Sequence, residues 1–327
     1  MRTRDRFDAG AAAAFLRERF ADPAITVEPL SGGNWSDAFA FRHEGADLVA
    51  RFGRHPEDYR KDARAADWRS PALPVPAFVD LGPVDGGAVD PGTAAGLDDP
   101  AGWWFAVTMR AHGTPLETAS PAGWPALIPE VVDLIATAAA LPYDADLGVG
   151  RWDGDGVAPH ATWRSFLLEV TEDGPGHRIA GWSTALAAHP EAQAAFDAGV
   201  ATLARLADAI DPPVGVVHAD LTNANVLVDR GRITAVLDWG SALYGDPLHE
   251  VAWLTYWQPW QPAVPGAALL AAALADGRLT VGGDVDRRLH ACRLHIGLGH
   301  LGYHAWNGDD VWLDRLTRLV LADVDPR

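Results

Sequence analysis

Three polar residues in the middle of the chain have a spacing that suits phosphoryl transfer. His218, Asp220 and Asn225 form the pattern H-x-D-x-x-x-x-N between apolar, strand-like residues, and Asp238 ends another apolar run eighteen positions after Asp220. In the kinase reaction, the aspartate of such a loop accepts the proton of the substrate hydroxyl. The asparagine and a later aspartate bind the magnesium ions of ATP. The pattern therefore predicts Asp220 as the catalytic base and Asn225 and Asp238 as metal ligands.

Each of these residues also has a purely structural interpretation. Asp220 and Asn225 could form turns, because their side chains bond to nearby backbone groups, and Asp238 could cap the segment that follows it. His218 is expected to brace the loop rather than to react. Turn formation explains any one of them, but not three at kinase spacing, so the phosphotransferase interpretation is favoured.

The composition narrows the class of protein and its partners. The chain has 327 residues, of which 48% are hydrophobic, and this length favours two domains or lobes. Its net charge of −18 disfavours nucleic acid and anionic membranes as partners and suits a cationic small-molecule substrate, although general surface acidity is the commoner cause. The single cysteine, Cys292, excludes an internal disulfide and fits a reducing cytoplasm.

The beginning of the chain indicates the same compartment. Residues 1–20 look like an amphipathic helix and not a signal peptide, and no apolar run is long enough to span a membrane. We expect a cytoplasmic protein that is a monomer or a weak dimer.

The order of the expected elements predicts an α+β fold of two lobes, like that of a protein kinase. Residues 1–109 are expected to form a small, β-rich N-terminal lobe that binds nucleotide, and residues 110–327 a larger, mainly helical C-terminal lobe. Apolar runs predict strands at 25–30, 38–41, 47–52 and 103–109, and a helix from Pro56 to about residue 69. Helical periodicity then predicts helices at 124–141, 192–210, 267–275, 284–306 and 310–324.

The first hairpin of the small lobe is the candidate phosphate site. The loop between its strands can present backbone N–H groups to phosphates, although an ordinary hairpin has the same look; its candidate residues are Ser31, Gly32, Gly33, Asn34 and Ser36. Kinases place a lysine on the third strand, paired with an acid on the next helix. Here that strand carries Arg51, and Asp62 is the expected partner. Met109 and Ala111, where the lobes join, are also expected at the nucleotide.

Several segments resemble the aminoglycoside phosphotransferases, and in particular the hygromycin branch of that family. The similar segments are residues 72–76 (ALPVP), 162–166 (TWRSF), 218–227, 231–239 (GRITAVLDW) and 257–260 (WQPW). The resemblance implies a bilobal kinase-like fold, ATP or GTP as phosphoryl donor and Mg²⁺ as cofactor. It also implies Asp220 as base, Asn225 and Asp238 as magnesium ligands, and Arg51 with Asp62 as the phosphate-holding pair. Segments 82–102 and 154–176 depart from the family pattern, which leaves the acceptor open.

Residues on the acceptor side are predicted from position and residue type. Asp153 and Asp155 lie in an acidic loop that is expected to border the site, and Asn223 lies within the catalytic loop. Trp257 and Trp260 could form an aromatic wall for a sugar ring, but their spacing equally suits a buried helix face.

The sequence thus predicts an ATP- and Mg²⁺-dependent kinase that phosphorylates a hydroxyl of a hygromycin B-like aminocyclitol and so confers antibiotic resistance. Two alternatives stay open. One is the same reaction on a macrolide, a nucleoside antibiotic or a metabolite. The other is a catalytically inactive kinase-like binding protein, which the intact Asp220, Asn225 and Asp238 disfavour.

Overall fold

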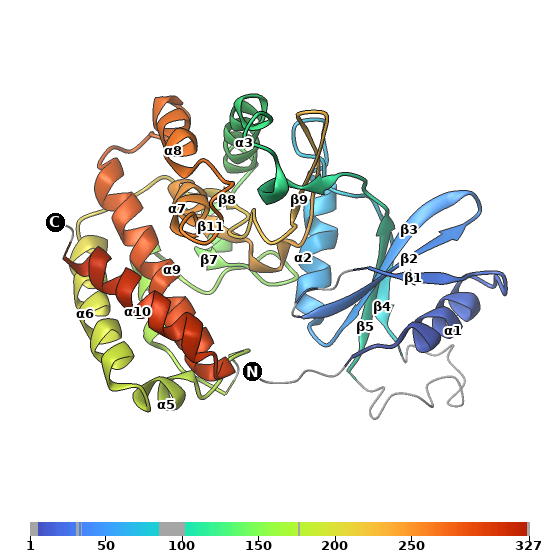
Figure 1. Ribbon diagram of the computed structural model, residues 1–327, viewed down its shortest axis with the longest axis horizontal. Helices are drawn as coiled ribbons and strands as arrows, with labels where there is room; N and C mark the ends of the chain where they lie inside the picture. Colours follow the sequence, from blue (N-terminus) through green and yellow to red (C-terminus); the bar gives the residue numbers. More distant parts are fainter. Residues whose placement is uncertain (1–5, 31–32, 34, 85–101, 176, 326–327) are drawn as a thin grey trace.

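A computed structural model of the chain describes residues 6–30, 33, 35–84, 102–175 and 177–325. It has two lobes, and Figure 1 shows a strand-rich lobe on the right and a helical lobe on the left. The small lobe contains a five-stranded antiparallel sheet of order β1-β2-β3-β5-β4. Its strands are β1 (Val27–Pro29), β2 (Ser36–His43), β3 (Ala46–Gly53), β4 (Phe78–Pro83) and β5 (Trp104–Met109).

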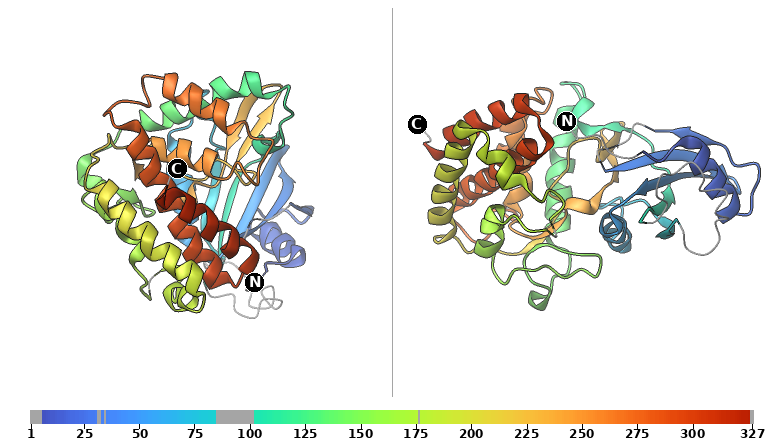
Figure 2. Two further views of the ribbon diagram at one scale, coloured as in Figure 1. Left: turned by 60° about the vertical axis from the view of Figure 1, so that its left-hand side comes forward. Right: turned by 90° about the horizontal axis from the view of Figure 1, so that it is seen from below.

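Two helices accompany this sheet. Helix α1 (Ala9–Arg19) begins at Asp8, whose side chain accepts from the first free N–H groups, and it packs Phe15 against Phe52 and Phe105 of the sheet. Helix α2 (Pro56–Asp67) has proline in its first turn, where no hydrogen bond is lost. Figures 1 and 2 place α2 between the sheet and the helical lobe, so residues on α2 can reach both.

The large lobe combines helices with two small sheets. Its helices are α3 (Trp124–Ala139), α4 (Trp163–Leu168), α5 (Trp182–Ala187), α6 (Pro190–Ala207), α7 (Leu248–Tyr256), α8 (Gly266–Ala275), α9 (Val285–Asn307) and α10 (Asp310–Val324). One sheet has the order β10-β9-β6 and the other β7-β11-β8. These strands are β6 (Thr114–Pro115), β7 (Gly150–Arg151), β8 (Gly215–Val217), β9 (Val226–Asp229), β10 (Arg232–Val236) and β11 (Leu243–Gly245).

The predicted long helices and the small-lobe strands are present, with ends shifted by a few residues. The helix expected to run to residue 69 ends at Asp67. Strand β4 and helices α4, α5 and α7 were not singled out by periodicity. Helices α4 and α5 contain six residues each, which is less than two turns and too short to show a clear repeat.

Candidate active site

The catalytic loop lies between β8 and β9, and its centre is the Asp220 carboxylate. Asn223 Nδ2 donates to one carboxylate oxygen at 2.9 Å, and Asn225 Nδ2 donates to the other at 3.0 Å. Asn225 Nδ2 also donates to the Asp220 carbonyl at 2.9 Å. The two amides therefore fix the direction of this carboxylate, and the structure brings the predicted base next to one predicted metal ligand.

Two glutamates support strained backbone in this loop. Ala219 and Ala224 have φ angles of 62° and 66°, which side-chain-bearing residues rarely adopt. The N–H group of Ala219 donates to Glu250 Oε2 at 2.8 Å, and that of Ala224 donates to Glu117 Oε1 at 2.6 Å. Charge-assisted hydrogen bonds are stronger than neutral ones, so they can offset the conformational cost. Motif spacing did not reveal either glutamate, because they lie 31 and 107 positions from the alanines they hold.

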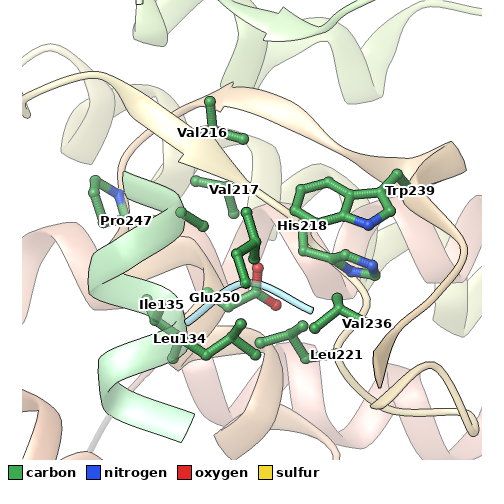
Figure 3. Close-up of a pocket in the computed structure, with 12 residues that line it drawn as sticks. Leu134, Ile135, Val216, Val217, His218, Leu221, Val236, Trp239, Pro247 and Glu250 are labelled. Carbon is green, nitrogen blue, oxygen red and sulfur yellow. The ribbon is translucent and has the colours of Figure 1, made fainter. Parts of the chain in front are cut away.

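Glu250 contacts the catalytic loop through the N–H group of Ala219. It lies on α7, is buried, and points among apolar side chains such as Leu134 and Leu221 in Figure 3. A cavity of about 10 Å³ adjoins it, and the second carboxylate oxygen has no hydrogen-bond partner. Burial raises the pKa of Glu250 to about 7, while backbone N–H groups of the loop oppose that shift.

His218 braces the loop, as expected from the sequence. Its Nε2 lies 2.8 Å from the Leu237 carbonyl, and the N–H of Asp220 donates to its Nδ1 at 3.2 Å. Because a carbonyl only accepts and an N–H only donates, the ring is neutral with its proton on Nε2. Burial lowers the pKa of His218 to about 4, in agreement with a neutral ring.

Asp238 lies beside the catalytic loop, two positions after the end of β10. The N–H of Leu237 donates to the Asn225 carbonyl at 2.7 Å, which ties the two predicted metal-ligand segments together. Asp238 has a φ of 59°, so the chain turns sharply at this residue. Burial raises the pKa of the Asp220 carboxyl well above its usual value, and the negative charge of Asp238 raises it further.

Arg51 connects this site to the small lobe. It lies on the central strand β3, opposite Ala38 of β2 and Ala106 of β5. Arg51 is therefore not a charged residue on an edge strand of the sheet. Its guanidinium lies 2.6 Å from Asp62 and 3.5 Å from Asp238. The predicted pair of Arg51 with Asp62 is therefore present in the structure, and it lies beside a predicted metal ligand.

Asp62 and Lys61 fasten α2 to the segment after Asp238. Asp62 Oδ1 accepts from the N–H of Trp239 at 2.6 Å. Lys61 Nζ donates to the carbonyls of Gly240 and Ala242 at 2.7 and 2.9 Å. Burial lowers the pKa of Lys61 to about 7. These contacts give Lys61 a structural role, and Arg51 takes the place of the strand lysine of kinases.

A cavity of about 370 Å³ between the lobes can hold a nucleotide base and sugar. Val49, Phe78 and Leu227 give it apolar walls, and Arg51, Asp62 and Asp238 lie at its charged end. Met109 and Ala111 line it, and Ser36 lines a neighbouring cavity of about 80 Å³ that contains Asp220. Their contact with a nucleotide stays a prediction. Gly33 is exposed, whereas the predicted residues Ser31, Gly32 and Asn34 lie outside the described residues.

The predicted acidic acceptor residues lie in a loop against α2. Gly154 N–H donates to Glu57 at 2.6 Å, and Arg64 donates to the Asp155 carbonyl at 3.3 Å. Asp153 accepts from N–H groups of its own turn and lines a cavity of about 390 Å³ beside the 80 Å³ cavity. Asp155 is exposed. Contact of either residue with an acceptor stays a prediction.

The two predicted tryptophans lie in the aromatic part of the large lobe. Trp257 is buried against His300, and Trp260 is partly buried against Trp312. Trp253 lies on α7, four positions before Trp257, and its indole N–H donates to the Thr222 hydroxyl of the catalytic loop at 3.1 Å. These positions suit core packing, and an acceptor role for Trp257 and Trp260 stays a prediction.

The donor atoms of the site suit magnesium. Asn225 uses its NH₂ group on Asp220, so its amide oxygen is the atom that can face a metal, and Asp238 supplies a carboxylate. Within the described part of the chain, no group of three or more histidine, cysteine or acidic residues could hold a metal ion. Magnesium prefers oxygen ligands and is usually bound by one or two protein side chains, with phosphates and water completing the shell. Asn225 and Asp238 fit that pattern.

The Asp220 carboxylate, the oxygen atoms of Asn225 and Asp238 and the Arg51 guanidinium gather where the two lobes meet, and this arrangement is typical of a phosphotransferase of the kinase type. The chain matches the family described as "Phosphotransferase enzyme family" over residues 26–288, and it belongs to that family. None of the described helices has the length and apolar character needed to cross a membrane.

A kinase and several aminoglycoside phosphotransferases are similar to this protein over most of the chain. Hygromycin-B 4-O-kinase from Escherichia coli is 29% identical over 247 residues, which cover 75% of this chain and 66% of that protein. Two crystal structures of aminoglycoside phosphotransferase APH(4)-Ia are also similar, and in each the similar region covers 98% of the APH(4)-Ia chain. The first has a TM-score of 0.79, 26% identity and 97% of this chain covered. The second, a thermostable mutant in complex with AMP-PNP and hygromycin B, has a TM-score of 0.77, 27% identity and 96% of this chain covered. The fold is also shared by aminoglycoside 2'-phosphotransferase-IIIa, at a TM-score of 0.63 and 14% identity over 97% of this chain and 99% of that one.

Proposed function

We propose that the protein transfers the terminal phosphoryl group of ATP to a hydroxyl of an aminoglycoside or aminocyclitol antibiotic of the hygromycin B type. The observation that carries this proposal is the Asp220 carboxylate, oriented by Asn223 and Asn225 beside Asp238. The similarity to hygromycin-B 4-O-kinase supports the choice of acceptor. The reaction would take place in the cytoplasm, where ATP is available, and would inactivate the antibiotic.

The site residues divide the reaction between them. Asp220 orients the acceptor hydroxyl and takes its proton as the oxygen bonds to phosphorus and the bond to the ADP leaving group breaks. The raised pKa of Asp220 makes it a better proton acceptor than an exposed aspartate. Arg51 binds phosphate oxygens from the small lobe. Magnesium, when held by Asn225 and Asp238, would supply positive charge next to the phosphates.

A cationic acceptor fits the charge of the chain. With a net charge of −18, the protein attracts cations over long distances. Exposed charges are screened beyond about 8 Å at physiological ionic strength. We therefore expect added salt to raise the KM for an aminocyclitol and to change kcat less. Efficient turnover of a neutral or anionic acceptor, with a KM independent of salt, would contradict the aminoglycoside assignment.

An acceptor panel tests the function directly. Purified protein with Mg²⁺ and ATP or GTP is offered hygromycin B, other aminoglycosides, a macrolide and a nucleoside antibiotic, and product is detected by mass spectrometry. We expect a singly phosphorylated hygromycin B-like product, formed about 100-fold or more slowly by Asp220→Asn. Phosphorylation of another class alone would keep the chemistry and replace the acceptor. Binding without any turnover would favour a kinase-like binding protein.

A further inference from the structure

A second arginine reaches the catalytic cavity from the large lobe. The cavity of about 80 Å³ that contains Asp220 and Asp238 is also lined by Arg51 and Arg178. Arg51 is fastened between two acids, Asp62 and Asp238. Arg178 instead belongs to the segment before α5, and sequence patterns did not single it out. Its position raises the question of what a second guanidinium does there.

Contacts from the small lobe hold Arg178 in place. Its Nη2 lies 2.7 Å from Asp58 Oδ1 on α2, and its guanidinium carbon lies 4.9 Å from the centre of the Trp35 ring. The Trp35 ring also contacts Tyr303 on α9, with ring centres 6.4 Å apart. Arg178 remains 34% exposed at its side chain, whereas Asp58 is 11% exposed. The arginine is thus oriented by a buried carboxylate and an aromatic ring, and it also lines the cavity.

The partner of Arg178 lies close to the predicted metal ligand. Asp58 Oδ1 and Asp238 Oδ1 both lie within 3.3 Å of the point where a Cβ atom on Gly240 would stand. Gly240 therefore leaves room for the two carboxylates to converge, and a Cβ atom there would stand in tight contact with both. Because Arg178 is hydrogen-bonded to that Asp58 oxygen, it stands beside the place where nucleotide phosphates are expected.

We propose that Arg178 contacts the transferring phosphoryl group and that Asp58 holds it ready in the nucleotide-free protein. This proposal rests on the proposed phosphotransferase function. Charge on the three equatorial oxygens of the transferring group must be stabilised, and a planar guanidinium fork binds two such oxygens at once. Removal of one such donor from a transition state costs about 10²- to 10³-fold in rate.

An alternative assigns Arg178 to structure alone, as a tie between α2, Trp35 and the large lobe. The two roles differ in which bound state they favour. A structural tie supports every nucleotide complex equally. A phosphoryl contact favours a complex that mimics the transferring group, such as ADP with aluminium fluoride and Mg²⁺, and leaves ADP binding unchanged.

The test compares those two ligands in wild-type protein, Arg178→Ala and Asp58→Asn. Dissociation constants for ADP and for ADP–aluminium fluoride are measured with Mg²⁺, and thermal unfolding shows whether each variant is folded. We expect Arg178→Ala to weaken ADP–aluminium fluoride about 100-fold or more while leaving ADP unchanged. Asp58→Asn removes the negative charge that attracts Arg178 in the free protein but keeps Arg178, so it should retain most of the preference for ADP–aluminium fluoride.

Two results would overturn the assignment: an unchanged preference in Arg178→Ala, or an equal loss for both ligands. Arg178→Lys serves if the alanine variant does not fold, and it should also lose most of the preference because an ammonium lacks the planar fork. The acceptor panel is a separate readout. A wild-type protein that prefers ADP–aluminium fluoride but phosphorylates no antibiotic would contradict the acceptor and leave Arg178 in its role.

Discussion

Asp220 is subject to opposing influences that together make it a suitable base. Burial and the charge of Asp238 raise its pKa, whereas the amides of Asn223 and Asn225 stabilise its charged form. The amides also fix its direction, which a raised pKa alone would not do. A carboxylate that is both oriented and basic is what proton transfer from a sugar hydroxyl requires.

Replacement of this base should therefore affect chemistry more than nucleotide binding. We expect Asp220→Asn to lower kcat by about 100-fold or more, because general base catalysis contributes roughly that much. The Kd for ADP should stay close to that of the wild type. Steady-state kinetics and nucleotide titration check both values, with Asp229→Asn, an exposed aspartate on β9, as the matched control. Near-normal turnover of Asp220→Asn would remove it from this role.

Asp238 should couple nucleotide affinity to magnesium. Its carboxylate lies 3.5 Å from Arg51 at the charged end of the larger cavity, where the phosphates are expected. We expect Asp238→Ala to lose the dependence of ATP affinity on Mg²⁺, since the metal would bridge this carboxylate and the phosphates. Titration of ATP with and without Mg²⁺ measures that dependence, and its persistence in the variant would contradict the assignment.

At the scale of elements, local patterns predicted the parts and distant contacts assembled them. Strand and helix positions follow from hydrophobic periodicity, and the spacing of Asp220 and Asn225 follows from one tight loop. Glu117, Glu250 and Arg178 escaped prediction because each acts on a residue that is remote in sequence and near only after the chain folds. Of the three, only Arg178 contacts a residue of the small lobe, Asp58 on α2. Those contacts depend on the angle between elements, which no short motif records.

The turn before α7 shows how such a distant contact can stabilise the site. Asp246 Oδ1 accepts from the N–H of Leu248 at 2.9 Å, as a turn residue does. The same carboxylate binds Arg288 of α9 through two hydrogen bonds of 2.8 and 2.5 Å, and both side chains are buried. This ion pair joins α7, which carries Glu250, to the longest helix of the described chain.

Loss of that pair should cost much more stability than loss of an exposed one. We expect Asp246→Ala to lower the free energy of unfolding by about 3–5 kcal/mol, because it leaves the Arg288 charge buried without its partner. Arg318→Ala breaks the exposed pair with Asp314 and should cost less than about 1 kcal/mol. Denaturant unfolding of both variants makes the comparison, and equal effects would show that burial of the pair does not matter.

At the scale of the whole molecule, the two lobes share one site, although the sheet of the small lobe has a core of its own. The core beneath the small-lobe sheet centres on aromatic side chains, and a separate cluster lies within the large lobe. A third cluster lies mostly in the large lobe but also includes Ala65, Leu73 and Val75 from the end of the small lobe. Helix α2 joins the lobes through Lys61 and Asp62, which bind the segment after Asp238. Changes that loosen this junction are therefore expected to reach catalysis and nucleotide binding together.

Buried histidines give the large lobe a specific sensitivity to acid. Burial lowers the pKa of His295 and His300 to about 4, and that of His249 to well below its ordinary value. His295 Nδ1 donates to the Leu167 carbonyl at 3.0 Å, which ties α9 to α4. That bond opposes the lowering of the His295 pKa, but burial outweighs it. An unfolded histidine has a pKa of about 6.5. Below that value the unfolded chain binds protons that the folded chain excludes, and stability falls as the pH is lowered towards 4.

A substitution at position 295 tests how much one of these buried histidines contributes to the pH dependence of stability. Asparagine can place an N–H donor near the position of Nδ1 but does not titrate, so His295→Asn keeps the bond to Leu167 and removes the charge change. Each excluded proton costs about 1.4 kcal/mol per pH unit within the window from 6.5 to 4. Glu250, with its pKa raised to about 7, acts in the opposite direction but is present in both proteins. Unfolding free energies measured from pH 7 to 4 should therefore fall less steeply for His295→Asn than for the wild type, by up to one proton. Identical slopes would mean that the pKa of His295 is the same in the folded and the unfolded protein.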